Sequence, residues 1–439
     1  PMNTHYLTAD EVTTALGISK GTLYSYVSRG LIRSEEIGGK TRAKRYNGAD
    51  VQKLQQRQAQ RKNPIQSAAT ALFFGDPVLE SAITLIHEGE LYYRGYNTLQ
   101  LARECHFEQV AALLWDDTAA EAAMPLLPSP ENRQTSPLLA PPIAATVRRL
   151  VAQGQIAEAF QMALITAAPL DLAAYQLAPN AVRQTGLRLL NLLTDVCAEA
   201  AGTSAASVEQ LEQVGNHLSS MQRIAQRLQQ VWAPNQATLA TVLDAALILC
   251  ADHELNASSF TARCVASTGA TPYAAVVAAL AALQGYKHGG STHEVTALLN
   301  EAAPDPARAV RERLRQGKPI PGFGHRLYPQ GDPRAKMLLA LARDTATHQA
   351  SDSRGLENET ALTTADTLID ITVQATENHP NLDFGLVVLA KALGLPDHAP
   401  FSLFALGRTA GWIGHILEQY ELDRLIRPRA QYTGVQPRR

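Results

Sequence analysis

Long apolar runs, cysteine and aromatic residues are all scarce in this sequence of 439 residues. No stretch of about 18 uninterrupted apolar residues occurs, so no membrane-spanning helix is expected. The start lacks the charged and apolar regions of a signal peptide. The four cysteines, Cys105, Cys197, Cys250 and Cys264, show no CxxC or zinc-type spacing. Buried thiols in a reducing compartment are therefore favoured over a disulfide framework, and we expect a cytoplasmic protein without membrane contact.

An excess of charge of one sign is also lacking overall, but the charge is unevenly distributed. The formal net charge is −2, whereas residues 1–62 contain eleven Lys and Arg against five Asp and Glu. This head therefore carries +6 and the remainder −8, which predicts a polyanionic partner for the head alone. Hydrophobic residues make up 46 % and aromatic residues 6 %. Because Ala and Leu outnumber Val and Ile, we expect two or three mostly helical units.

The head has the signals of a compact helical module. Thr8 followed by Glu11 three residues later is a capping box, which predicts a helix from there to Leu16. A second helix is expected over 22–28, a basic hairpin over 38–45 and a third helix over 50–60. A polar linker over 63–67 separates this module, residues 1–62, from the body.

The body is predicted to be poor in strands. The expected helices cover 153–167, 180–201, 208–231 and 239–250. The run 125–142, rich in Pro, is expected to be a loop, and 88–96 a short hairpin.

The densest chemical signal is the segment from Pro319 to Arg334. Gly322 and Gly324 allow the backbone to approach a ligand closely and expose His325 at a turn. A neutral donor, His325, and a fixed cation, Arg334, can then converge on one small anion. The alternative is an ordinary Gly- and Pro-rich loop with a surface histidine.

Two further polar segments interrupt apolar sequence. His288 precedes two glycines where a helix is expected to begin and backbone amides to be free. A metal site with His293 is disfavoured, since the i, i+5 spacing places the two rings on different helix faces. The polar segment 251–258 must be hydrogen-bonded internally or face a ligand.

Three charged residues stand in apolar surroundings near the C-terminus. Asp383 has apolar neighbours that would raise its pKa towards that of a working base, although a helix cap is the alternative. Arg408 and Arg427 each suit bidentate binding of a substrate carboxylate, or pairing with a structural carboxylate.

Taken in order, these segments resemble the citrate synthase family: DHE, HGG…E, PGFGH…DPR, PNxDF, GRTxGW and a terminal IRPR. The resemblance covers roughly residues 68–437. It implies a mostly α, two-domain fold with a large domain over 68–285 and 395–439 and a small domain over 286–394. It also implies a homodimer.

The resemblance assigns roles to individual residues. His288 would stabilise the enol of acetyl-CoA, Asp383 would remove the methyl proton, and His325 would polarise the keto oxygen of oxaloacetate. The residues implied to bind oxaloacetate or to line its pocket are His253, Arg334, Phe404, Arg408 and, from the other subunit, Arg427. Pro321, Gly322, Phe323 and Gly324 would lie against the adenine of CoA. No metal and no cofactor is implied beyond the CoA thioester, which is a substrate.

Three departures from the family pattern leave more than one acyl-CoA as the possible substrate. Ser291-Thr292-His293 follows HGG where many relatives read Ala-Asn-Glu, Phe384-Gly385-Leu386 follows Asp383, and Pro329 replaces a basic residue. An Si-type citrate synthase is the first hypothesis and a 2-methylcitrate synthase using propionyl-CoA the second. The third is a DNA-binding regulator whose synthase-like body senses a metabolite.

The head resembles the helix-turn-helix of MerR and excisionase proteins. That resemblance implies DNA contacts from the second helix and from a basic wing. The residues concerned are Lys20, Thr22, Ser25, Arg29 and Arg33, followed by Lys40, Arg42, Lys44 and Arg45. A module kept for protein contact or dimer packing is the alternative.

Overall fold

The chain folds into two compact units, Pro1–Glu80 and Ser81–Arg439. The computed structural model describes residues 6–36, 44–48, 50–51, 54, 79–116, 141–201, 223–349, 353–430 and 432–436. The predicted linker 63–67 and most of the predicted loop 125–142 lie outside these residues. No helix within the described ranges is long and apolar enough to cross a bilayer.

The first unit packs two helices on a small antiparallel sheet. Its elements are β1 (Tyr6–Leu7), α1 (Ala9–Leu16), α2 (Lys20–Ser28), β2 (Ser34–Glu36) and β3 (Lys44–Asn47), with strand order β1-β3-β2. The capping box of Thr8 and Glu11 is confirmed, because each side chain accepts a hydrogen bond from the other's amide. The second helix begins two residues earlier than predicted, since Ser19 caps it. The core consists of Val12, Leu16, Leu23, Ile32, Tyr46 and Val51.

The second unit begins with a three-stranded antiparallel sheet, followed by helices. The strands are β4 (Thr84–His87), β5 (Glu90–Tyr93) and β6 (Tyr96–Asn97), in that order in the sheet. The hairpin predicted over 88–96 is present as β5 and β6, which pair antiparallel with Tyr93 opposite Tyr96. Glu88 and Gly89 adopt positive φ and form a further turn, between β4 and β5.

The helices of the second unit fall into two sequence blocks. The first contains α5 (Thr98–Glu104), α6 (Phe107–Trp115), α7 (Pro141–Ala152), α8 (Ile156–Ala167), η3 (Ala168–Leu170), η4 (Leu172–Tyr175), α9 (Pro179–Ala201), α11 (Ile224–Trp232), α12 (Leu239–Cys250), α13 (Ala257–Ala266) and α14 (Pro272–Leu283). The second contains α15 (Ser291–Ala302), α16 (Pro306–Arg315), α17 (Pro333–Gln349), α18 (Ser353–Thr376), α19 (Leu382–Ala392) and α20 (Ala399–Leu422).

The predicted helix bounds hold best where the apolar pattern is continuous. Helix 239–250 is reproduced, and 180–201 starts one residue earlier. The helix expected over 153–167 begins only at Ile156, because Gly154 has a φ of 75° and separates it from α7. Of the helix expected over 208–231, only the part from Ile224 is described.

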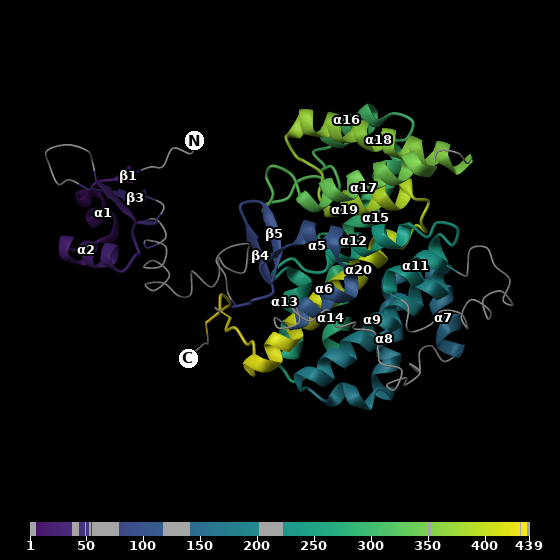
Figure 1. The fold of residues 1–439 in the computed structure, drawn as a ribbon, viewed down its shortest axis with the longest axis horizontal. Coiled ribbons are helices and arrows are strands. Elements are labelled where there is room, and N and C mark those ends of the chain that lie inside the picture. The colour runs from purple at the N-terminus through teal and green to yellow at the C-terminus, as the bar shows by residue number, and fades with distance from the viewer. Residues whose placement is uncertain are drawn as a thin grey trace. The chain divides into compact units, whose positions relative to one another are not determined.

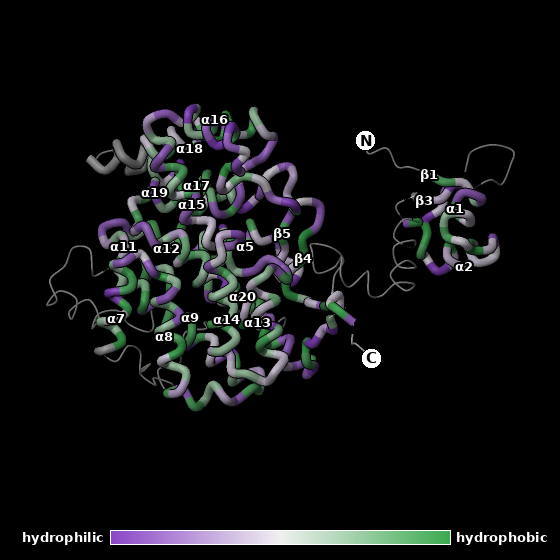
Figure 2. The backbone as a smooth tube through the Cα atoms, turned by 180° about the vertical axis from the view of Figure 1, so that it is seen from behind, coloured by the Kyte–Doolittle hydropathy of each residue, from purple (hydrophilic) through white to green (hydrophobic). Residues whose placement is uncertain are grey.

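Two buried hydrophobic clusters organise the second unit. The larger is built around α20, which contacts α6, α9, α12, α13 and α14 and runs through the centre of the helical body (Figure 1). The smaller lies among α15, α16, α18 and α19, which gather at one end of that body. Apolar stretches follow the inner helices in Figure 2. Since α19 contributes side chains to both clusters, it joins the two groups of helices.

Close backbone contact between α12 and α20 positions part of the site. A Cβ atom on Gly407 would lie 2.5 Å from the carbonyl oxygen of Leu247, so a larger residue would force the helices apart. One turn later, the amide of Gly411 donates to the carbonyl of Ala251 at 3.1 Å. This contact brings the end of α12 against the middle of α20.

Candidate active site

Three rings meet where the segment after α12 faces the loop before α17. The ring of His253 lies 5.2 Å from that of His325 and 5.6 Å from that of Tyr328. His253 Nε2 is 3.0 Å from the hydroxyl of Tyr328. Burial, followed by Arg334 and Arg408, lowers the pKa of His253 well below its usual value. This histidine is therefore a neutral hydrogen-bonding group at pH 7.

The proton of His325 can be placed from its neighbours. The amide of Leu327 donates to His325 Nδ1 at 3.2 Å, so the neutral ring carries its proton on Nε2. Burial, with a smaller effect of Arg334, lowers the pKa of His325 to about 4. At pH 7 this side chain is a neutral donor, as the first hypothesis requires.

The glycine turn before His325 is joined to the segment before α19. The amide of Gly324 donates to the carbonyl of His379 at 2.8 Å, and the amide of Asn381 donates to the carbonyl of Gly322 at 2.9 Å. These bonds hold two segments together that are more than fifty residues apart in the sequence. The two hydrogen bonds therefore fix the position of the His325 backbone relative to that of Asp383.

The turn that was predicted to contact CoA, Pro321–Gly324, packs on α19. The ring of Phe323 lies 4.8 Å from that of Phe384. Gly322 has a φ of 81°, and a Cβ atom there would lie 2.9 Å from the Cβ of Phe384. Only glycine fits this turn without displacing α19.

Arg334 is held by a buried carboxylate. Its Nε and Nη2 donate to the two oxygens of Asp332 at 3.0 and 2.8 Å, and both side chains are almost fully buried. The same carboxylate accepts the amide of Leu382 at 3.1 Å. Burial alone would raise the pKa of Asp332, but the neighbouring Arg334 keeps that pKa below the ordinary value. Arg334 is thus oriented by a structural ion pair, which fixes its position next to the start of α19.

Arg408 is a buried cation without a carboxylate partner. It is 1 % exposed, and its Nε donates to the carbonyl of Cys250 at 2.8 Å. No ion pair of Arg408 with Asp or Glu occurs among the described residues. Its guanidinium lies 5.0 Å from the ring of Phe404. The buried Asp252 carboxylate acts on Arg408 without forming an ion pair with it, and an anionic ligand would further compensate the charge of Arg408.

His288 lies in a turn that precedes α15. Its Nε2 is 2.9 Å from the hydroxyl of Ser258, and its ring is 5.9 Å from that of Phe404. Burial, with Arg408, lowers the pKa of His288 to about 3. The expectation of free amides here is wrong, because successive turns pair the amides of His288, Gly290 and Ser291 with nearby carbonyls.

Asp383 stands in the first turn of α19. The side chain of Asn381, not that of Asp383, caps this helix by accepting the amides of Asp383 and Phe384. The helix-cap interpretation of Asp383 is therefore wrong. Its Oδ1 is buried without a hydrogen-bond partner among the described residues, and burial raises its pKa to about 6.

Two residues from the sequence analysis do not join this group within the chain. Arg427 is exposed after α20 and has no hydrogen bond or ion pair to these residues. His293 lies on the exposed side of α15, 6.2 Å from the ring of Phe401. Among the described residues, no group of three or more His, Cys, Asp or Glu is arranged to hold a metal ion.

Sequence reasoning missed the residues that orient the others. Asp332 and Tyr328 stand inside the motif that contains His325 and Arg334, so their spacing was the available signal. Ser258 and Asn256 belong to the polar segment that was expected to be hydrogen-bonded internally or to face a ligand, and Asn256 caps α13. No sequence signal pointed to the buried hydrogen bond of His415 Nε2 with Asp252 at 3.2 Å, on the α20 side of the site.

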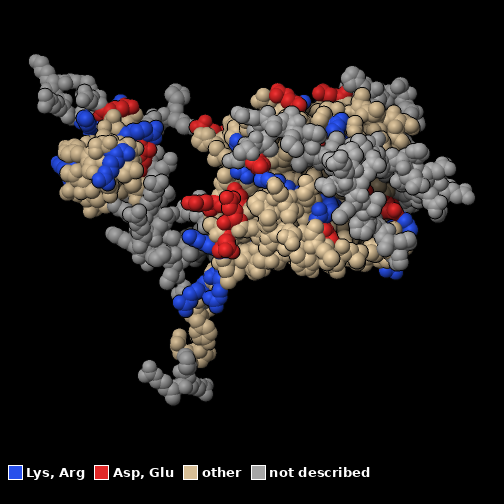
Figure 3. Space-filling model, turned by 60° about the horizontal axis from the view of Figure 1, so that its bottom comes forward, with Lys and Arg blue, Asp and Glu red and all other residues tan. Residues whose placement is uncertain are grey.

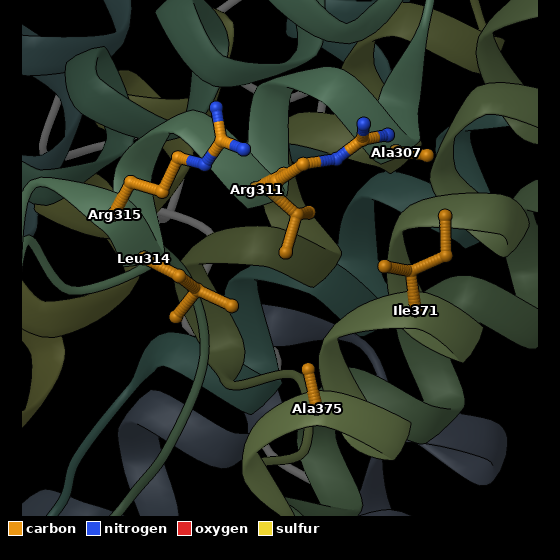
Figure 4. A pocket seen from close by; sticks show the side chains of 7 residues that line it. Ala307, Arg311, Leu314, Arg315, Ile371 and Ala375 are labelled. Carbon is orange, nitrogen blue, oxygen red and sulfur yellow. The ribbon is translucent and has the colours of Figure 1, made fainter.

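A separate cavity lies away from these residues. It has a volume of about 500 Å³ and lies between α16 and α18, lined by Ala307, Val310, Arg311, Leu314, Arg315, Ile371 and Ala375. Figure 4 shows the two guanidinium groups above apolar side chains. None of the residues of the candidate active site lines this cavity.

Three of the basic residues predicted to contact DNA are exposed but form ion pairs within the first unit. Lys20 pairs with Asp10 at 2.7 Å, and Arg45 pairs with Glu35 at 3.0 Å. Arg33 pairs with Asp50 at 2.8 Å. Basic and acidic side chains accordingly lie next to one another on the face seen in Figure 3.

The remaining predicted contacts of this unit differ in exposure. Arg29 and Lys44 are exposed and form no ion pair within the described residues. Thr22 is bonded to Ser19, and Ser25 is partly buried. Lys40 and Arg42 lie outside the described residues.

The arrangement of the second unit defines a class of site. Neutral imidazoles, a carboxylate with a raised pKa and two fixed guanidinium groups suit an acid–base reaction on a small anionic substrate. Residues 72–429 match the family described as "Citrate synthase, C-terminal domain", and residues 6–59 match "Helix-turn-helix domain". The chain belongs to the citrate synthase family, whose members are condensing acyltransferases, and it carries an N-terminal helix-turn-helix domain.

Individual relatives support this membership. A protein named citrate synthase from Haloferax volcanii is 30 % identical over 394 residues, which cover 81 % of this chain and 93 % of that protein. The 2-methylcitrate synthase 2 of Corynebacterium glutamicum is 30 % identical over 355 residues, which cover 79 % of this chain and 90 % of that protein. The crystal structure of citrate synthase from Pyrobaculum aerophilum superposes with a TM-score of 0.67 at 25 % identity, covering 84 % of this chain and 93 % of that one.

Proposed function

We propose that this chain condenses acetyl-CoA with oxaloacetate and then hydrolyses the thioester to citrate and CoA. The observation that carries the proposal is Asp383, whose buried Oδ1 has no partner among the described residues and whose pKa is raised to about 6. A carboxylate in this state can remove a proton from the methyl group of an acyl thioester. Neutral His288 and His325 lie in the same site.

His288 is suited to stabilise the enol oxygen. Asn256 Oδ1 accepts the amides of Ser258 and Ser259 and, at 2.7 Å, the hydroxyl of Ser258. The oxygen of that hydroxyl lies 2.9 Å from His288 Nε2, and burial keeps the His288 ring neutral with a single N–H. That N–H is proposed to donate to the thioester oxygen as Asp383 takes the methyl proton.

Bond formation then involves the other histidine. The enol carbon attacks the keto carbon of oxaloacetate, the enol proton returns to His288 as the thioester carbonyl re-forms, and the keto oxygen takes the Nε2 proton of His325. Arg334, Arg408 and His253 are proposed to hold the oxaloacetate carboxylates and carbonyl, in a pocket bounded by Phe404. Water then cleaves the thioester, releasing CoA as a thiol.

A thiol-release assay tests the reaction directly. Oxaloacetate with acetyl-CoA should release CoA, and Asp383→Ala should lower turnover by a factor of about 10² or more while oxaloacetate binding is retained. Absence of thiol release with any acyl-CoA would refute the enzyme hypothesis and favour a metabolite-sensing body.

Propionyl-CoA is the second candidate acyl donor. The chain is 30 % identical both to a citrate synthase and to a 2-methylcitrate synthase, so identity does not separate the two activities. The same assay with propionyl-CoA in parallel compares kcat/KM for the two thioesters, and the larger value identifies the substrate.

The proposed enzyme is a cytoplasmic homodimer. Ile165, Leu170, Leu172 and Tyr175 are more than half exposed along α8 to η4, which favours a covering partner surface. In such a dimer, exposed Arg427 is proposed to reach the site of the other subunit. All four cysteines are free thiols, which suits a reducing compartment. CoA is proposed to lie against Pro321–Gly324.

The domain limits are proposed as 1–62 for the head and 63–67 for the linker. The large domain comprises 68–285 and 395–439, and the small domain 286–394. The smaller hydrophobic cluster, from Val295 to Val388, supports the last range.

DNA binding by the head is a second proposed function, favoured by its match to a helix-turn-helix domain. Exposed Arg29 and Lys44 would contact phosphates without first breaking an ion pair, whereas Lys20, Arg33 and Arg45 would have to exchange one. Binding should weaken steeply with salt. No mobility shift of genomic fragments at low salt would argue for an interaction or packing module.

A further inference from the structure

Ser291 and Asp383 each have a buried polar atom without a partner. Within the described residues, neither Ser291 Oγ nor Asp383 Oδ1 has a hydrogen-bond partner, although both atoms are shielded from water. Ser291 is the first residue of α15 and Asp383 lies in the first turn of α19. The two helices pack against each other, next to α17 (Figure 1). The Ser291 hydroxyl is close enough to lower the pKa of Asp383 as a hydrogen-bond donor, so a small side-chain rotation would pair the two groups.

The surroundings of Asp383 single out this hydroxyl. From α17 and the loop before it, Arg334 and Asp332 act on Asp383 with opposite signs, and from α20 Arg408 acts at longer range. Burial is the largest effect and raises the pKa of Asp383. The Ser291 hydroxyl is the largest effect that lowers it, ahead of both arginines. Arg334 is already bonded to Asp332, and Arg408 to the carbonyl of Cys250.

We propose that Ser291 is a positioning residue that donates a hydrogen bond to the Asp383 carboxylate and holds it ionised and aimed at the acyl methyl group. The proposal rests on the proposed role of Asp383 as the base. Ser291 itself does not touch substrate. It acts by favouring the carboxylate over the carboxylic acid in a desolvated place. It also stands where this chain departs from the HGG-Ala pattern noted above.

Replacing the hydroxyl tests the proposal through the pH dependence of turnover. Ser291→Ala should move the acid limb of the kcat profile up by about one pH unit, because one hydrogen bond to the charged form is lost. Turnover should fall by about tenfold below the midpoint and stay within about twofold of wild type at pH 8.5. Ser291→Thr retains a hydroxyl and should restore the midpoint. Ser291→Cys, a weak donor, should shift it less than Ser291→Ala.

Thr296→Val is the matched control on the same helix. The Thr296 hydroxyl donates to the carbonyl of Thr292 one turn back, so its loss should leave the midpoint unchanged. An unchanged midpoint in Ser291→Ala and Ser291→Cys would overturn the proposal. A loss of turnover that is equal at every pH would also overturn it, because it would place Ser291 on the substrate.

A readout without turnover separates this proposal from the proposed function. The carboxyl carbon of Asp383, assigned by its absence in Asp383→Asn, can be titrated by ¹³C NMR in the full-length protein. Ser291→Ala should raise its titration midpoint by about one unit. If wild type releases no CoA yet this shift is seen, the reaction is refuted and the pairing stands. If CoA is released and the carboxyl titrates identically in both proteins, the pairing is refuted and the reaction stands.

Discussion

Asp383→Asn should stabilise the protein at neutral pH while removing its base. Burial raises the pKa of Asp383 to about 6 from an ordinary 3.8. In the folded state the carboxylate is therefore disfavoured by about two pKa units, or about 3 kcal/mol, at any pH above both values. The amide of Asn has nearly the same shape and no charge to desolvate.

The sign of the pH dependence follows from the raised folded pKa. Below the unfolded pKa near 4 the group is protonated in both states and costs nothing. As pH rises through about 6, the folded protein bears the whole cost of ionising Asp383. The stability of Asp383→Asn relative to wild type should therefore rise by about 3 kcal/mol between pH 4 and pH 8, mostly below pH 7. A constant penalty from an unpaired Asn amide shifts this curve without changing its slope.

Urea titrations of both proteins across that pH range, followed by tryptophan fluorescence, measure the difference. Asp370→Asn on α18 is the matched control, because this carboxylate is exposed and lies outside the candidate active site. A flat difference curve for Asp383→Asn would mean that Asp383 titrates like a solvated carboxyl. The argument for it as a base poised by burial would then fail.

Three further predictions address the loop, the dimer and the head. Gly322→Ala should lower turnover by a factor of about 10², because a Cβ 2.9 Å from Phe384 displaces His325 by a fraction of an ångström. Gly317→Ala has a similar φ of 65° but nothing within 4 Å of the new Cβ, so it should lose stability and keep turnover. A mixture of Arg427→Ala and His288→Ala proteins should recover part of the activity that each lacks if Arg427 serves the other subunit. Deletion of residues 1–62 should leave a folded dimer with wild-type thiol release, because all groups of the candidate active site lie beyond them.

Each of these has an outcome that would contradict it. Equal losses in Gly322→Ala and Gly317→Ala would show that backbone strain, not contact with α19, limits the turn. Failure to complement, with subunit exchange verified by differently tagged proteins, would place Arg427 outside the neighbouring site. An insoluble or inactive truncation would make the head part of the enzyme and move the domain boundary.

Short-range signals in the sequence were sufficient for much of the local structure. The capping box at Thr8, the continuous apolar helix 239–250 and the spacing within PGFGH each depend on residues close together in the chain. The hairpin over 88–96 was likewise predicted from neighbouring residues, although the additional strand β4 was not. The late start of α8 was missed, because Gly154 adopts a positive φ that ends α7 and the apolar pattern does not specify it.

The sequence by itself determined which chemical groups the candidate site contains, namely His288, His325, Asp383 and the arginines, in an order that resembles one family. Only the tertiary structure decided the protonation and the hydrogen-bond partners of these groups. It showed that Asn381 caps α19, that Asp332 pairs with Arg334, and that within the described residues Asp383 Oδ1 has no hydrogen-bond partner and Arg408 forms no ion pair. A pKa, a tautomer and an unpaired charge depend on which distant segments approach within a few ångströms. That approach is produced by the contact of α12 with α20 and by the bonds that join the glycine turn to α19.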